Sequence, residues 1–349
     1  MSFGIPVRNG LGVGLLASTF LSSLRIGGRP ALMLNFVNTT ALDSRITFTR
    51  TTTATVTGSN GVIQSSAINA PRFDYDPVTL ASKGLLIEEQ RINLLLNSLI
   101  DGTSLSTQSV TVAAVAHTIS FYGTGTITLA GAAVATVTGT GVYPNRQTLT
   151  FTPIVGVLVC TVSGSVQYAQ LEAAGTVSSF IPTAGTAVTR APDIAVMTGT
   201  NFSSWYNANE GSFLVGFDVT ALVTAAVKPV FAAHDGTVNT NRVYLNAGIS
   251  GQTNLLINSG GVSQASILGP FVVANTPAKS ASAYKVNSFA LVVSNSAIFA
   301  DTAGSVPVGV NKLDIGSFQP ASAYLNGHVR TLTYYNTRLP DATLRALTV

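Results

Sequence analysis

The sequence predicts an all-β protein, and two observations carry this prediction. First, apolar and polar residues alternate over short segments in the last 140 residues, as expected for strands whose successive side chains point to opposite faces. Second, clusters of Gly, Asn, Asp, Ser and Pro separate these segments, which favours an antiparallel sandwich over a nucleotide-binding α/β sheet. The segments are residues 212–219, 230–233, 242–249, 254–257, 288–293, 312–315 and 329–335.

Charged residues are scarce along the whole chain. Only 9% of the 349 residues are Asp, Glu, Lys or Arg, against about a quarter in an average globular protein. A monomer with so few surface charges is poorly soluble, so we expect a homo-oligomer, such as a trimer, or a larger assembly. The net charge of +4 and the scattered arginines give no reason to expect a nucleic-acid partner. Cys160 is the only cysteine, which excludes an internal disulfide and favours a buried apolar role.

Residues 1–101 are predicted to form an extended docking segment. Residues 1–24 are apolar and are followed by Arg25 and Arg29. We interpret this opening as an arm or short helix that docks on another protein, and a secretory signal is the alternative. It is too short to span a bilayer, so we expect no membrane insertion. Strands are expected at 32–36 and 45–50.

Seven of the 13 charged residues among the first hundred lie between residues 68 and 95, where PRFDYD (71–76) is followed by GLLIEEQRINLL (84–95). Acidic and basic side chains next to apolar runs are best explained as ion pairs that fix how the segment folds back on its neighbours. A catalytic use of Asp74 with Asp76, or of Glu88 with Glu89, is the alternative.

Residues 102–183 are predicted to form a second, smaller sandwich. Only Arg146 is charged between residues 102 and 171, and apolar residues there alternate with hydroxyls. Residues 184–197, rich in Ala, Thr and Pro, are expected to be a linker. Residues 198–349 then form the third unit.

The last unit contains the segments SFLVGF (212–217), KVNSFALVV (285–293), KLDIGS (312–317) and LNGHVRTLTYY (325–335). Through them it is similar to a concanavalin A-like (laminin G-like) sandwich, in the version found at the C-terminus of bacteriophage tail and fibre proteins. The resemblance implies a short helix after the last strand, and LPDATLRAL (339–347) fits, with Asp341 as its cap. The strand that ends at Arg50 and residues 68–95 are similar to a segment that precedes such modules, with Arg50, Arg72, Asp74, Glu88, Arg91 and Asn93 matching and Ile92 standing where Thr is common. Residues 102–183 resemble small jelly-roll inserts of the same proteins, through QYAQLEA (167–173) and SFIPT (179–183).

No catalytic residues are predicted. A glycosidase needs two carboxylates roughly 5 to 10 Å apart, but the acids after residue 209 are isolated: Glu210, Asp218, Asp235, Asp301, Asp314 and Asp341. The three histidines, His117, His234 and His328, lack a recognisable nucleophile motif. No cofactor or metal site is expected, although Asp235 or Asp301 is a candidate calcium ligand if neither simply forms a turn.

A glycan site is predicted in NFSSWYNAN (201–209), where the only tryptophan lies next to amides. Trp205 and Tyr206 would cover a sugar ring, while Asn207 and Asn209 would bind its hydroxyls. The alternative is that Trp205 plugs the sandwich as a core residue.

The resemblance implies a non-enzymatic protein of the phage particle, localised to the virion. Its first segment would contact other virion proteins, and its last unit would bind a glycan of the host surface as part of a tail fibre or appendage. A head fibre or decoration protein bound to the capsid is the second interpretation, and a surface-polysaccharide hydrolase is the third.

Overall fold

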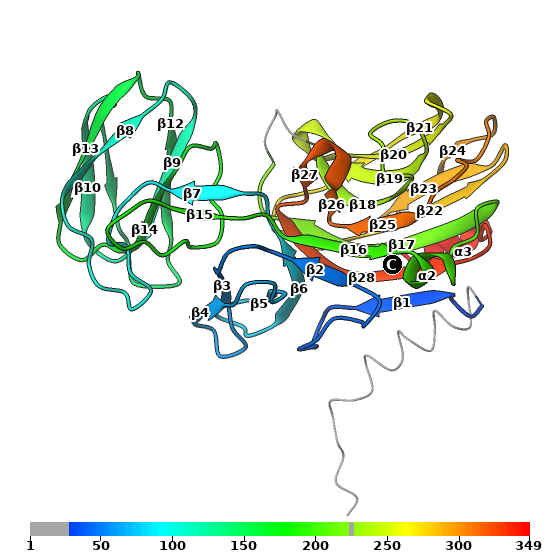
Figure 1. Ribbon diagram of the computed structural model, residues 1–349, viewed down its shortest axis with the longest axis horizontal. Coiled ribbons are helices and arrows are strands. Elements are labelled where there is room, and N and C mark those ends of the chain that lie inside the picture. The colour runs from blue at the N-terminus through cyan, green and yellow to red at the C-terminus, as the bar shows by residue number, and fades with distance from the viewer. Residues whose placement is uncertain (1–27, 223–226) are drawn as a thin grey trace, which may run out of the picture.

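The computed structural model describes residues 28–222 and 227–349, and it confirms the all-β prediction. A large and a small sandwich lie side by side, joined by a narrow neck (Figure 1). The predicted docking arm at residues 1–24 lies outside the described residues.

The large sandwich consists of two antiparallel sheets. All seven strands predicted from the C-terminal segments are confirmed in these sheets. The eight-stranded sheet has the order β24 (Phe299–Asp301), β23 (Phe289–Val293), β22 (Ala278–Lys285), β17 (Glu210–Val219), β28 (Gly327–Tyr335), β6 (Ser82–Ile87) and β5 (Phe73–Tyr75), with β1 (Leu32–Asn35) also paired to β28. The seven-stranded sheet has the order β2 (Thr47–Thr49), β16 (Ile194–Thr198), β25 (Lys312–Ile315), β18 (Lys228–His234), β19 (Arg242–Ala247), β20 (Gln252–Ser259) and β21 (Val262–Phe271).

The described part of the expected docking segment 1–101 belongs to the large sandwich. Strands β1 and β6 both hydrogen-bond to β28, and β2 hydrogen-bonds to β16. The expectation of a separate segment therefore needs correction. Its apolar residues, among them Leu34, Phe36 and Ile87, are buried in the same core as Phe213 and Phe231, so the N-terminal strands complete this sandwich.

The small sandwich has its own core, which includes Ile119, Phe121, Leu158 and Cys160. Cys160 is fully buried, as expected for a small apolar side chain. The first sheet of the small sandwich has the order β11 (Ala135–Thr138), β10 (Thr126–Gly131), β13 (Gly156–Ser163) and β8 (Gln108–Val112). The second sheet has the order β12 (Gln147–Phe151), β9 (His117–Tyr122) and β14 (Gln167–Glu172).

The neck is a two-stranded sheet of β7 (Arg91–Asn93) and β15 (Val188–Arg190), which leave and re-enter the large sandwich next to each other (Figure 1). The expected linker 184–197 is thus largely structured, because β15 forms the neck and β16 lies within the seven-stranded sheet. The prediction of a linker missed these two strands. A segment rich in Ala, Thr and Pro can also form short strands when its partners are far away in sequence.

Short elements complete the fold. They are the hairpins β3 (Ala54–Thr57) with β4 (Ile63–Ser66) and β26 (Ser317–Phe318) with β27 (Ala323–Tyr324), the helices α2 (Thr200–Ser203) and α3 (Asp341–Ala346), and the 3-10 turns η1 (Ile249–Gly251) and η2 (Gln319–Ala321). The expected helix after the last strand is α3, and its Leu344 is buried together with the following Leu347. Pro340, and not Asp341, is its N-cap residue, and Asp341 instead pairs with Arg338. None of the helices in the described residues has the length and apolar character that crossing a bilayer requires.

Candidate functional site

A buried network of ions lies where the neck meets the large sandwich. We call Arg50, Arg72, Glu88, Arg190 and Asp193 the ion network. Asp193 accepts hydrogen bonds from Arg50, at 3.0 Å, and from Arg72. Glu88 pairs with Arg72 at 2.8 Å and with Arg190 at 2.9 Å. All five side chains are at least nine-tenths buried, so the ions stabilise one another in place of water.

The ion network also binds the segment that returns from the small sandwich. Glu88 also accepts hydrogen bonds from the backbone N–H and the hydroxyl of Ser179, at 2.8 and 2.6 Å, and this serine lies between β14 and β15. Burial would raise the pKa of Glu88, but the charges of Arg190 and Arg72 outweigh it and keep this pKa far below its usual range. The prediction that ion pairs fix residues 68–95 against their neighbours is therefore confirmed for Arg72 and Glu88.

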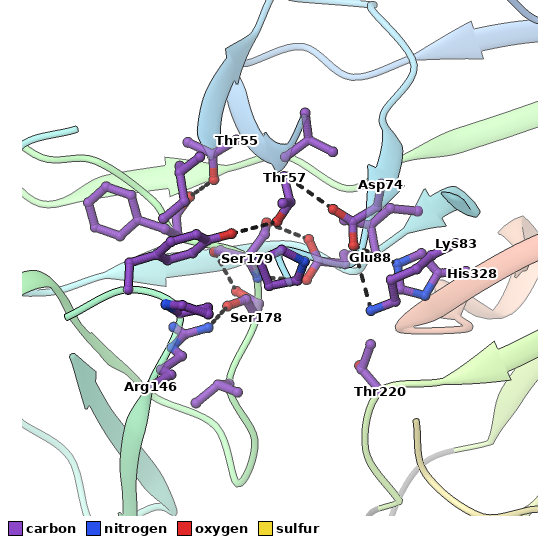
Figure 2. Close-up of a pocket in the computed structure, with 18 of the residues that line it drawn as sticks. Thr55, Thr57, Asp74, Lys83, Glu88, Arg146, Ser178, Ser179, Thr220 and His328 are labelled. Carbon is purple, nitrogen blue, oxygen red and sulfur yellow. Dashed lines mark hydrogen bonds and ion pairs between the residues drawn. The ribbon is translucent and has the colours of Figure 1, made fainter. Parts of the chain in front are cut away.

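A cleft of about 200 Å³ opens beside the ion network, between the N-terminal strands and the two sandwiches. We call it the junction cleft. Figure 2 shows Asp74, Lys83 and His328 gathered on one side of this cleft, and Arg146 with Ser178 on the other. Arg146 is fixed in place by hydrogen bonds from its guanidinium to the Ser178 carbonyl (2.7 Å) and the Ser120 hydroxyl (2.8 Å).

His328 is the central side chain of the cleft wall. Its Nδ1 lies 2.7 Å from the Asp218 carboxylate and its Nε2 lies 2.9 Å from the Asp74 carboxylate. Burial alone would lower the pKa of His328, but these two hydrogen bonds and the two negative charges raise it overall. For the Asp74 carboxyl the signs are reversed. Burial alone would raise its pKa, but the hydrogen bond from His328 and the charge of His328 lower this pKa overall. The arrangement is an ionic clamp between β5 of the N-terminal strands and β17 and β28.

Among the described residues that line the junction cleft, the carboxyl groups are those of Asp74 and Glu88. A glycosidase needs one protonated carboxylic acid next to its second carboxylate. The cleft is lined by Asp74 and Glu88, and the pKa of each lies below its ordinary value because of cationic neighbours. Both carboxylates are therefore ionised, and both are used in ion pairs.

A second hollow lies on the outer face of the seven-stranded sheet, and we call it the groove. Arg242, Tyr244 and Asn246 alternate along β19 and share this face, while Val243, Leu245 and Ala247 point into the core. Asn254 and Leu256 of β20 lie opposite Asn246 and Tyr244. Phe318 packs on Tyr244 with ring centroids 5.0 Å apart, and exposed Leu268 and Val238 form walls.

The floor of the groove carries polar atoms without partners in the described protein. Asn246 is only 1% exposed, yet neither its amide oxygen nor its amide nitrogen makes a hydrogen bond to any described residue. The amide oxygen of Asn254 also makes no hydrogen bond to any described residue. Buried polar groups are nearly always hydrogen-bonded, and leaving one unpaired costs about 1–3 kcal/mol. An apolar hollow with a few convergent polar groups is the usual form of a small-molecule site.

The predicted sugar platform at Trp205 needs correction. Trp205 is only 5% exposed, its indole N–H donates to the Asn201 carbonyl at 2.7 Å, and its ring packs on Phe202 and Tyr334. The alternative interpretation, a core residue that closes the sandwich, is the one that the structure shows.

The neighbours of Trp205 also have structural contacts. The ring of Tyr206 stacks on Phe202 with centroids 4.6 Å apart. The side chain of Asn207 donates to the Asn336 carbonyl at 2.7 Å and accepts from the backbone N–H of Asn209 at 3.0 Å. These contacts order the chain before β17, and residues 205–209 do not line the groove or the junction cleft.

The two candidate calcium ligands lie in turns. Asp235 accepts hydrogen bonds from Thr237 and Asn241, and Asp301 accepts one from the backbone N–H of Ala303. These are the contacts of turn-forming Asp residues. No cluster of three or more potential metal ligands occurs among residues 28–222 and 227–349.

Comparisons with known proteins give structural neighbours only. No family model and no curated protein matches the sequence. Among solved structures, NanB sialidase from Streptococcus pneumoniae aligns with 43% of this chain and 26% of its own, at 12% identity and a TM-score of 0.37. The CBM40 of Ruminococcus gnavus IT-sialidase, bound to α2,3-sialyllactose, aligns with 42% of this chain and 86% of its own, at 13% identity and a TM-score of 0.36. This chain thus spans about a quarter of the NanB sialidase that it matches.

A signal for the groove is present in the sequence. The strand at 242–249 was predicted, and its polar positions, Arg242, Tyr244 and Asn246, recur with period two opposite an apolar face. A long basic side chain, an aromatic and an amide on one face of a strand form the pattern that marks the site. The glycan site was predicted at residues 201–209 instead, because these contain the only tryptophan of the chain.

Proposed function

We propose that this chain is a non-enzymatic structural protein of a bacteriophage particle, a tail fibre or appendage that attaches to a glycan of the host surface through its large sandwich. The resemblance of the sequence to phage tail and fibre proteins supports the virion assignment. The single observation that supports glycan attachment is the groove, where the side-chain amide of Asn246 and the amide oxygen of Asn254 lack partners among the described residues and lie next to Tyr244 and Arg242.

A sugar suits this groove because its hydroxyls both donate and accept hydrogen bonds. The amide of Asn246 offers both kinds of atom, and the adjacent walls of Leu268 and Val238 can contact the apolar C–H face of a ring. Hydrolysis is not part of the proposal, since the carboxylates of the junction cleft are both ionised and paired.

A glycan array probed with the full chain tests the attachment. We expect Asn246→Leu to abolish binding without loss of folding stability, because the substitution removes an unpaired buried amide. Asn209→Ala is the matched control, since Asn209 is an exposed amide away from the groove, and we expect it to bind as the unmodified chain does. Equal binding by Asn246→Leu and the unmodified chain would refute the groove as the site.

The virion assignment has its own test. Electron microscopy of phage particles labelled with an antibody to this chain is expected to show label on the tail. Label on the head would favour the capsid-bound head fibre or decoration protein, and unlabelled particles would contradict a virion role.

Light scattering of the purified chain is expected to give a multiple of the monomer mass, as the low charge content predicts.

A further inference from the structure

Arg242 is the charged side chain of the groove. The other lining residues within the described chain are apolar, aromatic, amide-bearing or glycine, and no carboxylate is among them. Arg242 lies at the start of β19, half-buried, with its guanidinium 5.0 Å from the ring centroid of Tyr244 and 5.4 Å from that of Phe318. These two rings support the flat guanidinium from the side of the groove floor.

The guanidinium is held in place but is not fully used. Its Nε donates to the Asn258 amide oxygen at 2.9 Å, and one terminal nitrogen donates to the Val238 carbonyl at 2.9 Å. An arginine has five N–H donors. Three N–H groups therefore remain for another acceptor, including both of those on the second terminal nitrogen.

Arg242 differs from the fully buried arginines of this protein. Arg50, Arg72 and Arg190 each pair with a carboxylate within 3.0 Å. Arg242 forms no ion pair with any described residue. Removing a charge from water is costly unless an opposite charge compensates it, so a half-buried, rigidly held and unpaired cation is prepared for an anionic partner.

We propose, on the basis of the glycan attachment proposed above, that the groove binds a carboxylated sugar and that Arg242 determines this specificity. A guanidinium donates two parallel hydrogen bonds to a planar carboxylate, an arrangement that a neutral hydroxyl does not reproduce. A carboxylate attached directly to a pyranose ring would meet Arg242 at one end of the groove. The ring hydroxyls would then reach Asn246 and Asn254, which follow on the same face.

The test compares glycans that differ only in the carboxyl group. The full chain is titrated with glucuronic acid-terminated oligosaccharides and with the same oligosaccharides after reduction of the carboxyl to a hydroxymethyl group, and a set with a terminal sugar phosphate is measured in parallel. We expect the carboxylated set to bind at least about tenfold more tightly than the reduced set, as charge-assisted hydrogen bonds imply. Arg242→Gln should remove this difference in affinity. Arg242→Lys should retain part of the difference, because lysine keeps the positive charge but cannot donate the two parallel hydrogen bonds of a guanidinium.

The controls distinguish failure of the proposed role of Arg242 from failure of the proposed glycan attachment. Lys285→Gln removes an exposed positive charge outside the groove lining and is expected to leave the preference unchanged. Unfolding curves of Arg242→Gln that match those of the unmodified chain show that the groove is intact. Equal binding of carboxylated and reduced sugars overturns the role of Arg242, and tighter binding of the phosphate set overturns the preference for a carboxylate, while glycan attachment stands in both cases. Absence of binding to every glycan on the array, neutral or acidic, overturns both.

Discussion

Asp193 holds two arginines that come from distant parts of the chain. Arg50 is 143 residues away and Arg72 is 121 residues away, and all three side chains are fully buried. A surface ion pair contributes little to stability, but removing this buried carboxylate leaves Arg50 without a counter-ion among the described residues and leaves Arg72 with Glu88 alone.

We therefore expect Asp193→Asn to lower the free energy of unfolding by about 3–5 kcal/mol, as is typical when one partner of a buried ion pair is lost. Urea denaturation followed by circular dichroism measures this change. Asp43→Asn is the control, because Asp43 pairs with Arg45 at the surface, where the expected loss is below about 1 kcal/mol. Similar losses for the two variants would contradict the importance of the ion network.

The ionic clamp around His328 predicts how stability depends on pH. The pKa of His328 is raised in the folded state above its ordinary value of 6.5, so its proton is held more tightly in the folded than in the unfolded chain. The stabilisation is therefore complete below pH 6.5 and is lost as pH rises through the folded-state pKa. The pKa of Asp74 is lowered, so its own contribution is lost only as pH falls through that value in acid.

Unfolding free energies measured from pH 5 to pH 9 test this prediction. We expect a decline as pH rises above 6.5 in the unmodified chain and a flatter profile in His328→Asn. The matched variant His117→Asn should retain the decline, because the Nδ1 of His117 contacts a backbone carbonyl and not a carboxylate. A profile that is the same in all three proteins would rule out the clamp.

Single residues show how far sequence reasoning reached at this scale. The charges at Arg72 and Glu88 were predicted to form ion pairs, because mixed charges next to apolar runs require partners. Asp193 was assigned to a linker, since the sequence does not show that residues more than a hundred positions away converge on it. The same applies to His328, whose partners Asp74 and Asp218 come from separate strands.

At the scale of elements, strands with strong alternation were predicted and those made of small polar residues were missed. Strand β22 has the sequence AKSASAYK, and most of its residues are buried because the strand lies between β17 and β23. Ser and Ala give little apolar contrast, so the period of two was not visible. The long edge strand β21 was missed for the same reason.

The helix α2 and the residues after it place Trp205 in the core, next to Phe202 and Tyr334. We expect Trp205→Ala to lower the free energy of unfolding by about 3–5 kcal/mol, the usual loss for a buried aromatic. Glycan affinity per folded molecule should not change, since Trp205 does not line the groove. Thermal unfolding and the glycan titration, performed on the same preparation below its melting temperature, measure both effects. A selective loss of affinity with normal stability would reinstate Trp205 as a ligand-binding residue.

At the scale of the whole molecule, the large sandwich is assembled from both ends of the chain. Strands β6 and β1 pair with successive parts of β28, and they supply Leu32, Leu34 and Ile87 to the core. A fragment of residues 198–349 lacks these strands together with β2 and nearly all of β16. We expect it to be unfolded or aggregated, because it exposes apolar core and unpaired strand edges.

Circular dichroism and the dispersion of amide signals in NMR spectra measure the folding of this fragment. Residues 28–349, which keep every described strand, are the control and are expected to fold. A cooperative unfolding transition in the 198–349 fragment would show that the C-terminal unit is independent, as its sequence boundaries had suggested.

The fold class followed from local patterns, whereas the division into units did not. Alternation reveals strands one at a time, but which strands share a sheet depends on contacts between residues far apart in sequence. Strands β1, β2, β5 and β6 were therefore separated from a sandwich whose sheets they complete.

The paired strands β7 and β15 place the entrance and the exit of the small sandwich side by side. Because these two strands are neighbours, a different domain could be inserted between them without a change in the large sandwich. Exchange of this module by recombination, with Ser178 and Ser179 retained for the ion network, would give related proteins a different small sandwich beside an unaltered groove.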